Sequence, residues 1–530
     1  MLDISQAALK QQTVNLGQIK VTPYKVLILL ITISAALCLL RFNAIPVGAY
    51  FDDAHYIILS ESLAAGTGYR LINSPSAPIE EAFPPGWPIL LTPFATLFPE
   101  NYTVLKLLSL IFWLGCIPLM YLLFRARLQP IHTIAVVALA VVNSSLIGMS
   151  GTVMSEPAYL FLSLSTLVLF DLWQQGERYN RVWLLILIVL AAFYTLMIRT
   201  IGITLLGALL LYLIFKYRRF ILPTAGVLLL VLVPLTWFNY RNGGALVFSP
   251  LYYEHVRYVL SNMIEFVQFW KYASYFSVDV ASNALIPVFG SNFISKALTP
   301  NVSYWLGVSL LAFTAFGYFI SLHRFKVMDL YVALYFIIFY IWVIYTAGTD
   351  HQTRLIIPMI PFLYFYLLQA ALWCVNSFLA SSTTYKSVLV VAFVIMIMMI
   401  SLVLNYREVR LPVYDRVTYL PAGNQWLREN TSSDAIVLSP NGMPNYLYSR
   451  RRTEISGPGI IDIQQYVEDK DIDYILIQPH LYEWDTGNQL DEYTSSTLLP
   501  YLVNHPTNFK QVYEDLNHNV KVFQVMPLTD

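Results

Sequence analysis

The sequence is poor in charged side chains, because Asp, Glu, Lys and Arg make up only 12% of its 530 residues. Soluble globular chains carry roughly 25%, so the low value argues against a cytosolic enzyme. Apolar residues account for 57% of the chain, which is typical of a protein that crosses a membrane several times. A formal net charge of zero also argues against a nucleic-acid partner.

Cysteine is also scarce. The three cysteines, Cys38, Cys116 and Cys374, all lie in apolar runs. Neither a disulfide framework nor a thiolate metal site is therefore predicted. A cleaved signal peptide is not predicted either, because about 25 mostly polar residues precede the first apolar run and no small-residue cleavage site follows it directly.

The charges that are present divide the chain into two parts. Residues 406–530 contain 10 basic and 17 acidic side chains, whereas residues 1–405 contain 22 and 15. This change in composition predicts a lipid-solvated domain over 1–405 and a soluble domain over 406–530.

The soluble part alternates between helical and extended patterns. A helix is expected at 424–429, and strands are expected at 435–438, 474–477 and 520–525, separated by turn signals such as Asn441-Gly442. These patterns predict a small α/β domain.

Long apolar runs set the topology of the membrane part. A bilayer core of roughly 30 Å needs about 20 helical residues. The chain has eleven apolar runs of suitable length, which begin near Val26, Val104, Ile131, Pro157, Val182, Ile201, Phe220, Val302, Leu330, Leu355 and Val388. We therefore expect about eleven transmembrane helices, although the fifth and sixth runs are short enough to form a re-entrant hairpin instead.

Basic residues predict the orientation of these spans, because Lys and Arg concentrate in cytoplasmic loops. With a cytoplasmic N-terminus, the inner segments hold 13 basic and 4 acidic residues, against 9 and 11 in the outer segments of residues 1–405. Two long loops, 45–103 and 241–301, and the domain over 406–530 then lie outside. The lack of outer cysteine favours the periplasmic side of a bacterial inner membrane over the endoplasmic reticulum lumen.

Three carboxylates lie on the predicted outer side. Asp52 and Asp53 follow the first span, and Glu156 stands in a short outer turn. Each of them would also suit a helix start, where such residues act as caps. Two adjacent carboxylates at a membrane interface are costly, however, and a general base or a cation site is the usual reason to hold them there.

Basic and aromatic residues occur at the same level. Arg199, Arg241, His351 and Arg354 could each simply reach lipid headgroups, but four such groups on the outer side better fit a lipid phosphate. Phe83 and Trp87 flank a Pro-Pro-Gly segment and, with Tyr56, are expected to line a sugar or polyprenyl site. Aromatic residues of this kind also form ordinary interfacial belts.

At these residues the sequence resembles the GT-C superfamily of membrane glycosyltransferases. The resemblance is to the branch that uses polyprenyl- or dolichyl-phosphate sugars, which includes protein O-mannosyltransferases and the aminoarabinose transferases of lipid A. The matching motifs follow one another in chain order: Asp52-Asp53-x-x-Tyr56, Ala65 to Tyr69, Pro84 to Gly86, Ser155 to Pro157, Arg241-Asn242, and His351 to Arg354 followed by Pro358 and Pro361.

The resemblance implies an inverting single displacement on the outer face. Asp52 would be the base that deprotonates an acceptor hydroxyl, and Asp53 and Glu156 would orient the acceptor or an ion. The donor phosphate would be held by a set of cations: Arg199, Arg241, His351 and Arg354. The acceptor class, whether lipid, glycan or protein, stays open.

The sequence leaves the donor sugar and the need for a metal ion open. Related aminoarabinose transferases often have a Lys just before the Pro-Pro pair, whereas this chain has Phe83, so the donor sugar does not follow from that subgroup. The resemblance covers metal-dependent and metal-independent enzymes. A divalent cation such as Mg²⁺ or Mn²⁺ would be bound by the carboxylates of Asp52, Asp53 and Glu156.

Two other functions stay open from the sequence. A transporter or flippase of lipid-linked saccharides is one, but transporters usually carry ionisable groups near mid-membrane and show repeats, which this sequence lacks. A non-catalytic scaffold with a glycan-binding outer domain is the other.

Overall fold

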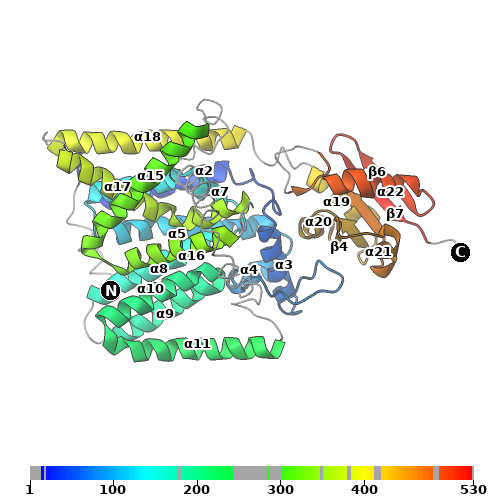
Figure 1. Ribbon diagram of the computed structural model, residues 1–530, viewed down its shortest axis with the longest axis horizontal. Coiled ribbons are helices and arrows are strands. Elements are labelled where there is room, and N and C mark those ends of the chain that lie inside the picture. The colour runs from blue at the N-terminus through cyan, green and yellow to red at the C-terminus, as the bar shows by residue number, and fades with distance from the viewer. Residues whose placement is uncertain are drawn as a thin grey trace.

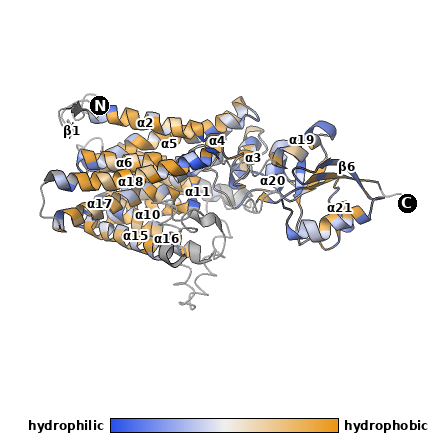
Figure 2. Ribbon diagram, turned by 90° about the horizontal axis from the view of Figure 1, so that it is seen from above, coloured by the Kyte–Doolittle hydropathy of each residue, from blue (hydrophilic) through white to orange (hydrophobic). Residues whose placement is uncertain are grey.

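The structure is a computed structural model, and it describes residues 14–16, 19–175, 181–242, 285, 300–345, 350–378, 383–410, 419–481 and 489–527. Helices of the N-terminal part lie side by side in a bundle, and a smaller α/β domain lies at one end of it (Figure 1). The bundle helices are mostly hydrophobic, whereas the smaller domain has more hydrophilic residues (Figure 2).

Every apolar run expected to span the membrane is helical in the structure. The bundle helices are α2 (Pro23–Leu40), α5 (Tyr102–Phe124), α6 (Pro130–Val142), α7 (Ser144–Ser150), α8 (Glu156–Gln175), α9 (Arg181–Ile198), α10 (Ile203–Lys216), α11 (Ile221–Asn242), α15 (Pro300–Ser321), α16 (Val327–Tyr345), α17 (Ile360–Phe378) and α18 (Thr383–Arg410). Short 3₁₀ segments connect some of them: η1 (Thr200–Gly202), η2 (Arg218–Phe220), η4 (Leu322–Arg324) and η5 (Asp350–Met359).

Length and composition identify a smaller number of membrane spans. Among the described residues, five helical segments are long and apolar enough to cross a membrane, or six if the bent pair α6 and α7 is one span. Four further helices, among them α9 and α10, are apolar but shorter. The chain therefore has a multi-span helical part, while the full set of eleven crossings and their sidedness stay predictions.

The bend between α6 and α7 has a local cause. The two helices meet at 58°. Asn143 lies between them in an extended conformation, and its side chain accepts hydrogen bonds from the backbone amides of Ser145 and Leu146, both at 3.1 Å. A side chain that caps a new helix in this way ends the preceding one. The second helix therefore starts in a new direction at Asn143.

The loop over 45–103 carries two helices, α3 (Asp52–Ala64) and α4 (Gly86–Leu97). Amphipathic patterns over 53–65 and around 87–98 predict two helices here of the kind that lies in a membrane interface with one apolar face. Both segments are helical, but α3 does not have a single covered face, because residues 53–60 are all buried. The helix lies between the bundle and the α/β domain, so both of its sides are covered (Figure 1).

A glycine allows α4 to approach the end of α9. A Cβ atom at Gly86 would lie 2.5 Å from the backbone carbonyl carbon of Met197, so no larger residue fits without a shift. The hydroxyl of Tyr194 donates to the Gly86 carbonyl at 3.0 Å. This close approach places the start of α4 against the turn that follows α9.

The C-terminal part forms a mixed five-stranded sheet in the order β4-β3-β5-β7-β6. Its elements are α19 (Tyr419–Asn430), β3 (Ile436–Ser439), α20 (Gly442–Ser449), β4 (Arg452–Ile455), α21 (Ile463–Asp469), β5 (Tyr474–Ile477), the π-helical turn η8 (Thr494–Leu498), α22 (Leu499–Asn504), β6 (Phe509–Asp515) and β7 (Val520–Val525). Strand β3 is parallel to β4 and β5, and β7 is antiparallel to β5 and β6. The expected strands 474–477 and 520–525 are confirmed, and 435–438 is shifted by one residue.

Helix α20 and strand β4 contact the loop that carries α3. The Tyr448 hydroxyl donates to the Val47 carbonyl at 2.9 Å, and the Thr453 amide donates to the Asn73 carbonyl at 2.7 Å. The composition boundary near residue 405 falls within α18, which continues to Arg410. A short N-terminal hairpin, β1 (Val14–Leu16) and β2 (Ile19–Val21), completes the described elements.

Candidate active site

Four of the charged residues singled out in the sequence lie at the ends of helical elements that meet near the α/β domain. Asp52 is the first residue of α3, and Glu156 is the first residue of α8. Arg199 lies in the turn between α9 and η1, and Arg354 lies in η5. Because these ends converge, residues more than 300 positions apart form one cluster, which we call the charged cluster.

Arg354 and Asp52 form the more accessible ion pair of the charged cluster. Nη2 of Arg354 lies 2.6 Å from Oδ2 of Asp52. The Asp52 side chain is 24% exposed and that of Arg354 is 18% exposed. A molecule that enters the cluster can therefore reach both groups.

Arg199 and Glu156 form a second, more deeply buried ion pair. Nη1 of Arg199 lies 2.6 Å from Oε1 of Glu156, whose side chain is 1% exposed. The same Nη1 donates to Oγ of Ser155 at 3.1 Å, and the Tyr56 hydroxyl lies 3.2 Å from that Oγ. Neither oxygen of Glu156 has a well-aligned hydrogen bond among the described residues, so this carboxylate retains unused acceptor capacity.

Asp53 has a different task from its neighbour Asp52. It is buried, and its carboxylate accepts hydrogen bonds from the backbone amides of Gly48 at 2.8 Å and Tyr50 at 3.2 Å. Burial raises the pKa of Asp53 to about 6. Phe51 lies between Tyr50 and the start of α3, and its φ of 56° is unfavourable for a residue with a Cβ atom. Asp53 therefore holds the turn that presents Asp52.

Lys106, a residue not predicted from the sequence to take part in the site, holds the segment just before this turn. Its Nζ donates to the carbonyls of Phe42 at 3.2 Å and Ile45 at 2.9 Å, and the residue is 6% exposed. The sequence signal for this role was a lysine near the start of an otherwise apolar helix, because burying an ammonium group requires compensating partners.

A buried pair of His55 and Glu80 was also missed. Nε2 of His55 lies 2.5 Å from Oε2 of Glu80, and Oε1 of Glu80 accepts the Phe83 amide at 3.0 Å. Burial alone would raise the pKa of Glu80, but the hydrogen bond and charge of His55, together with backbone amides, lower it below its ordinary value. The pair fixes the loop segment before α4 to α3.

The three aromatic residues expected to line a substrate site differ in exposure. Tyr56 reaches the charged cluster through Ser155, and burial raises its pKa above the ordinary value. Phe83 is half-buried and stacks on His55 with ring centroids 4.0 Å apart. Trp87 is 0% exposed and donates Nε1–H to the Val153 carbonyl at 3.0 Å. The indole of Trp87 is thus part of the core, and the substrate-lining role of these three residues stays a prediction.

Two predicted phosphate-binding residues and one predicted outer segment cannot be placed. The side chains of Arg241 and His351 lie outside the described residues, as does most of the loop over 241–301. Their roles stay predictions.

The carboxylates do not assemble into a metal-binding group. No set of three or more His, Cys, Asp or Glu side chains within the described ranges could hold a metal ion. Asp53 is satisfied by backbone amides, and Asp52 and Glu156 each lie against an arginine.

The charged cluster combines two carboxylates with two guanidinium groups. Arginine is suited to binding phosphate oxygens, and a carboxylate with spare acceptor capacity is suited to accepting a hydroxyl proton. The arrangement can therefore hold an anion and a hydroxyl group next to each other.

Comparisons with known proteins give structural matches only. No protein-family model matches the sequence, and no curated protein matches it significantly. ArnT from Cupriavidus metallidurans, solved bound to undecaprenyl phosphate, is 14% identical with a TM-score of 0.55, and the match covers 94% of this chain and 97% of that one.

The archaeal oligosaccharyltransferase AglB from Archaeoglobus fulgidus also matches. Its complex with an inhibitory peptide and a dolichol-phosphate is 13% identical with a TM-score of 0.56, over 86% of this chain and 69% of that one. An Archaeoglobus fulgidus oligosaccharyltransferase tethered to an acceptor peptide with the NVT sequon is 14% identical with a TM-score of 0.57 over the same shares. The chain therefore shares the fold of these two solved proteins, in agreement with the fold that the resemblance to the GT-C superfamily implies.

Proposed function

We propose that the protein is a membrane glycosyltransferase that moves a sugar from a polyprenyl-phosphate donor to an acceptor hydroxyl. The observation that carries the proposal is the pairing of two of the three candidate carboxylates with arginines in one cluster, Asp52 with Arg354 and Glu156 with Arg199. Similarity to proteins solved with undecaprenyl phosphate and with dolichol-phosphate supports a lipid-phosphate donor. The predicted topology supports the periplasmic or luminal face.

The proposed reaction is a single displacement at C1 of the sugar. The acceptor oxygen forms a bond to C1 while the bond from C1 to the phosphate oxygen breaks. Asp52 takes the hydroxyl proton, and the bonding electron pair leaves with the polyprenyl phosphate. The configuration at C1 inverts because attack and departure occur on opposite sides.

Arg354 would interact both with the base Asp52 and with the phosphate of the donor. In the structure its guanidinium binds Asp52 at 2.6 Å. A donor phosphate at Arg354 would compete with Asp52 for the same donors, and it would stabilise the charge that develops on the leaving group. Donor binding would thus weaken the hold on Asp52 and release the base for the acceptor.

Glu156 and Arg199 would serve the acceptor side. The unused acceptor capacity of Glu156 suits an acceptor hydroxyl, and Arg199 is the ion-pair partner of this buried carboxylate. Asp53 acts as a positioning residue through the turn before α3.

A genetic complementation experiment tests the proposal. Lipid-linked sugars and envelope glycans from a strain that lacks the protein are compared by mass spectrometry, before and after complementation. Asp52→Asn should leave the donor accumulated and the glycan missing. Glu81→Gln, an exposed carboxylate in the same loop, should restore the glycan.

Purified protein separates this proposal from transport. Wild-type protein in proteoliposomes should transfer the sugar, and Asp52→Asn should fold with an unchanged thermal midpoint but form no product. Full activity of Asp52→Asn would contradict the role of the base. Uptake of labelled lipid-linked saccharide without any glycosyl product would favour a transporter instead.

A further inference from the structure

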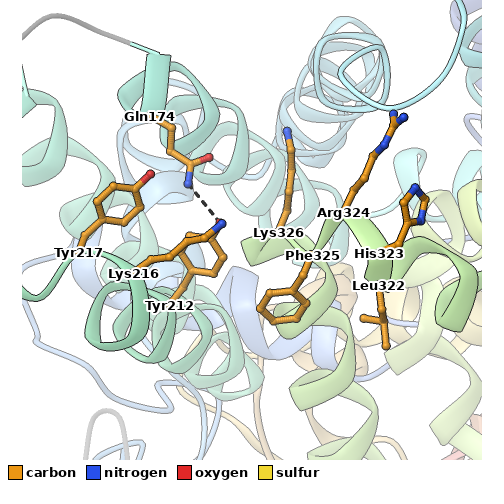
Figure 3. Close-up of a pocket in the computed structure, with 9 residues that line it drawn as sticks. All are labelled: Gln174, Tyr212, Lys216, Tyr217, Leu322, His323, Arg324, Phe325 and Lys326. Carbon is orange, nitrogen blue, oxygen red and sulfur yellow. Dashed lines mark hydrogen bonds between the residues drawn. The ribbon is translucent and has the colours of Figure 1, made fainter.

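A second polar site lies at the other end of the bundle. It is a cavity of about 510 Å³, with Gln174 of α8 and the end of α10 on one side and the segment 322–326 on the other (Figure 3). Helix α8 begins with Glu156 in the charged cluster, and Gln174 is 18 residues further along it. At 1.5 Å per residue the two sites are roughly 27 Å apart, which is about one bilayer core.

The cavity is lined by an excess of positive charge. Lys216, Arg324 and Lys326 all lie on its wall. Lys326 is neutralised, because its Nζ lies 3.0 Å from Oδ2 of Asp171. Lys216 and Arg324 have no carboxylate partner among the residues that the structure describes.

The nearby Asp329 does not offset this charge. It is held by two contacts with the guanidinium of Arg127, at 2.7 Å and 2.5 Å, and it also accepts a hydrogen bond from the Tyr366 hydroxyl at 2.8 Å. Its negative charge is therefore already compensated by Arg127.

Tyr212 points to the kind of ligand that this cavity takes. The residue is 3% exposed, and its hydroxyl accepts hydrogen bonds from Lys216 at 3.0 Å and from Gln174 at 3.4 Å (Figure 3). No acceptor for the hydroxyl's own proton occurs within the described part of the chain. A buried donor without an acceptor is unusual, so the missing partner is expected to come from a ligand.

The cavity thus offers hydrogen-bond donors and positive charge. An ammonium, a guanidinium and a phenol match the several acceptor oxygens of a phosphate group. The aromatic ring of Phe325 stacks on Tyr212 with centroids 6.1 Å apart and provides an apolar wall. Basic pockets between membrane helices are known to bind phospholipid headgroups.

We propose that this cavity binds a phosphate group, carried by an anionic phospholipid in the leaflet opposite the charged cluster. Inorganic phosphate shares the same chemistry and is the other source to be distinguished. The site is separate from the proposed donor-binding residues and does not depend on the proposed glycosyl transfer.

Binding to the full-length protein in detergent tests this site. The protein is titrated with short-chain phosphatidylglycerol, short-chain phosphatidylcholine and inorganic phosphate, and binding is followed by native mass spectrometry and by the thermal midpoint. The double variant K216Q/R324Q removes the two uncompensated charges. R218Q/R219Q removes the same charge from exposed residues on the same end of the bundle that do not line the cavity, and it is the matched control.

We expect phosphatidylglycerol to bind the wild type and the control equally, and to bind K216Q/R324Q at least about tenfold more weakly. Tyr212→Phe, which keeps the ring packing, should weaken binding by about fivefold. The same pattern with inorganic phosphate would also support the site, with a free anion as its ligand. Equal weakening in both double variants, or no binding of either probe to the wild type, would overturn the proposal.

Discussion

Arg450 of the α/β domain forms a two-point ion pair with Glu61 of α3, with Nη1 to Oε2 at 2.8 Å and Nη2 to Oε1 at 3.0 Å. Nη2 of Arg450 also donates to the hydroxyl of Tyr102 in α5, at 2.5 Å. One arginine therefore connects the α/β domain with the helix that begins at Asp52 and with the bundle.

Breaking this contact should loosen the domain and lower activity together. Arg450→Gln removes the charge and leaves Glu61 without its two-point partner, which should cost about 2 to 4 kcal/mol in the free energy of unfolding. The thermal midpoint and sugar transfer are measured side by side. Arg452→Gln changes an exposed neighbouring arginine and should alter neither. An unchanged thermal midpoint in Arg450→Gln would show that the contact does not hold the domain.

Arg354 should affect donor binding more than protein stability. Loss of a charge-assisted hydrogen bond to phosphate costs about 1.5 to 3 kcal/mol, so Arg354→Gln should raise the KM for the lipid-linked donor by about tenfold or more. Arg354→Lys keeps the charge without the planar fork and should show a smaller rise. Initial rates over a range of donor concentrations measure this, with Arg410→Gln as an exposed control. An unchanged KM in Arg354→Gln would remove Arg354 from the donor site.

Asp53 should make the stability of the protein depend on pH in a defined direction. Burial raises its pKa to about 6, from an ordinary value of 3.8. The native state therefore holds this proton more tightly than the unfolded chain between these values. The contribution of Asp53 to the free energy of unfolding then falls as pH rises through that window, by about 3 kcal/mol in total, and is constant above it.

The comparison of wild type with Asp53→Asn isolates this contribution. The side chain at position 53 of the variant does not titrate. The thermal midpoint of the variant, relative to that of the wild type, should therefore rise between about pH 4 and pH 6. Unfolding in detergent is followed across this range. Asp469→Asn, an exposed carboxylate in α21, should run parallel to the wild type. Parallel curves for Asp53→Asn would contradict the raised pKa.

The helices and two of the strands could be predicted from the sequence for a simple reason. Apolar runs of about 20 residues have few alternatives to a helix in a bilayer, because lipid offers no hydrogen bonds and the backbone N–H and C=O groups must pair with each other within the segment. The strands β5 and β7 stand out because their β-branched and aromatic residues are bounded by turns. The strands β4 and β6 were missed, since their short, polar patterns such as Arg452 to Ile455 resemble loops.

The composition of the charged cluster could be predicted, but its pairing could not. Asp52 and Arg354 are 302 positions apart, and only the packed helix ends show that they meet. Asp52 and Asp53 look equivalent in the sequence, although the structure directs Asp53 to backbone amides and Asp52 toward Arg354. Local pattern carries no information about which of two neighbouring carboxylates faces the site.

The buried pair of Glu156 and Arg199 allows a structural role to be separated from a role in the reaction. Removing one member leaves an uncompensated buried charge, so Glu156→Gln and Arg199→Gln should each lose about 3 to 5 kcal/mol of stability. The double variant should lose less than the sum of the two, because no buried charge remains unpaired. Thermal midpoints of the four proteins measure this coupling.

Activity of the same four proteins shows what the pair does for transfer. If Glu156 orients the acceptor hydroxyl, sugar transfer should stay low in the double variant even where its thermal midpoint recovers, because Gln replaces the carboxylate with one neutral acceptor oxygen and an amide donor. Saturating acceptor should restore part of the rate, since the loss lies in acceptor binding and orientation. Recovery of full activity together with stability would instead assign Glu156 and Arg199 a purely structural role and leave Asp52 and Arg354 as the groups that act on the substrates.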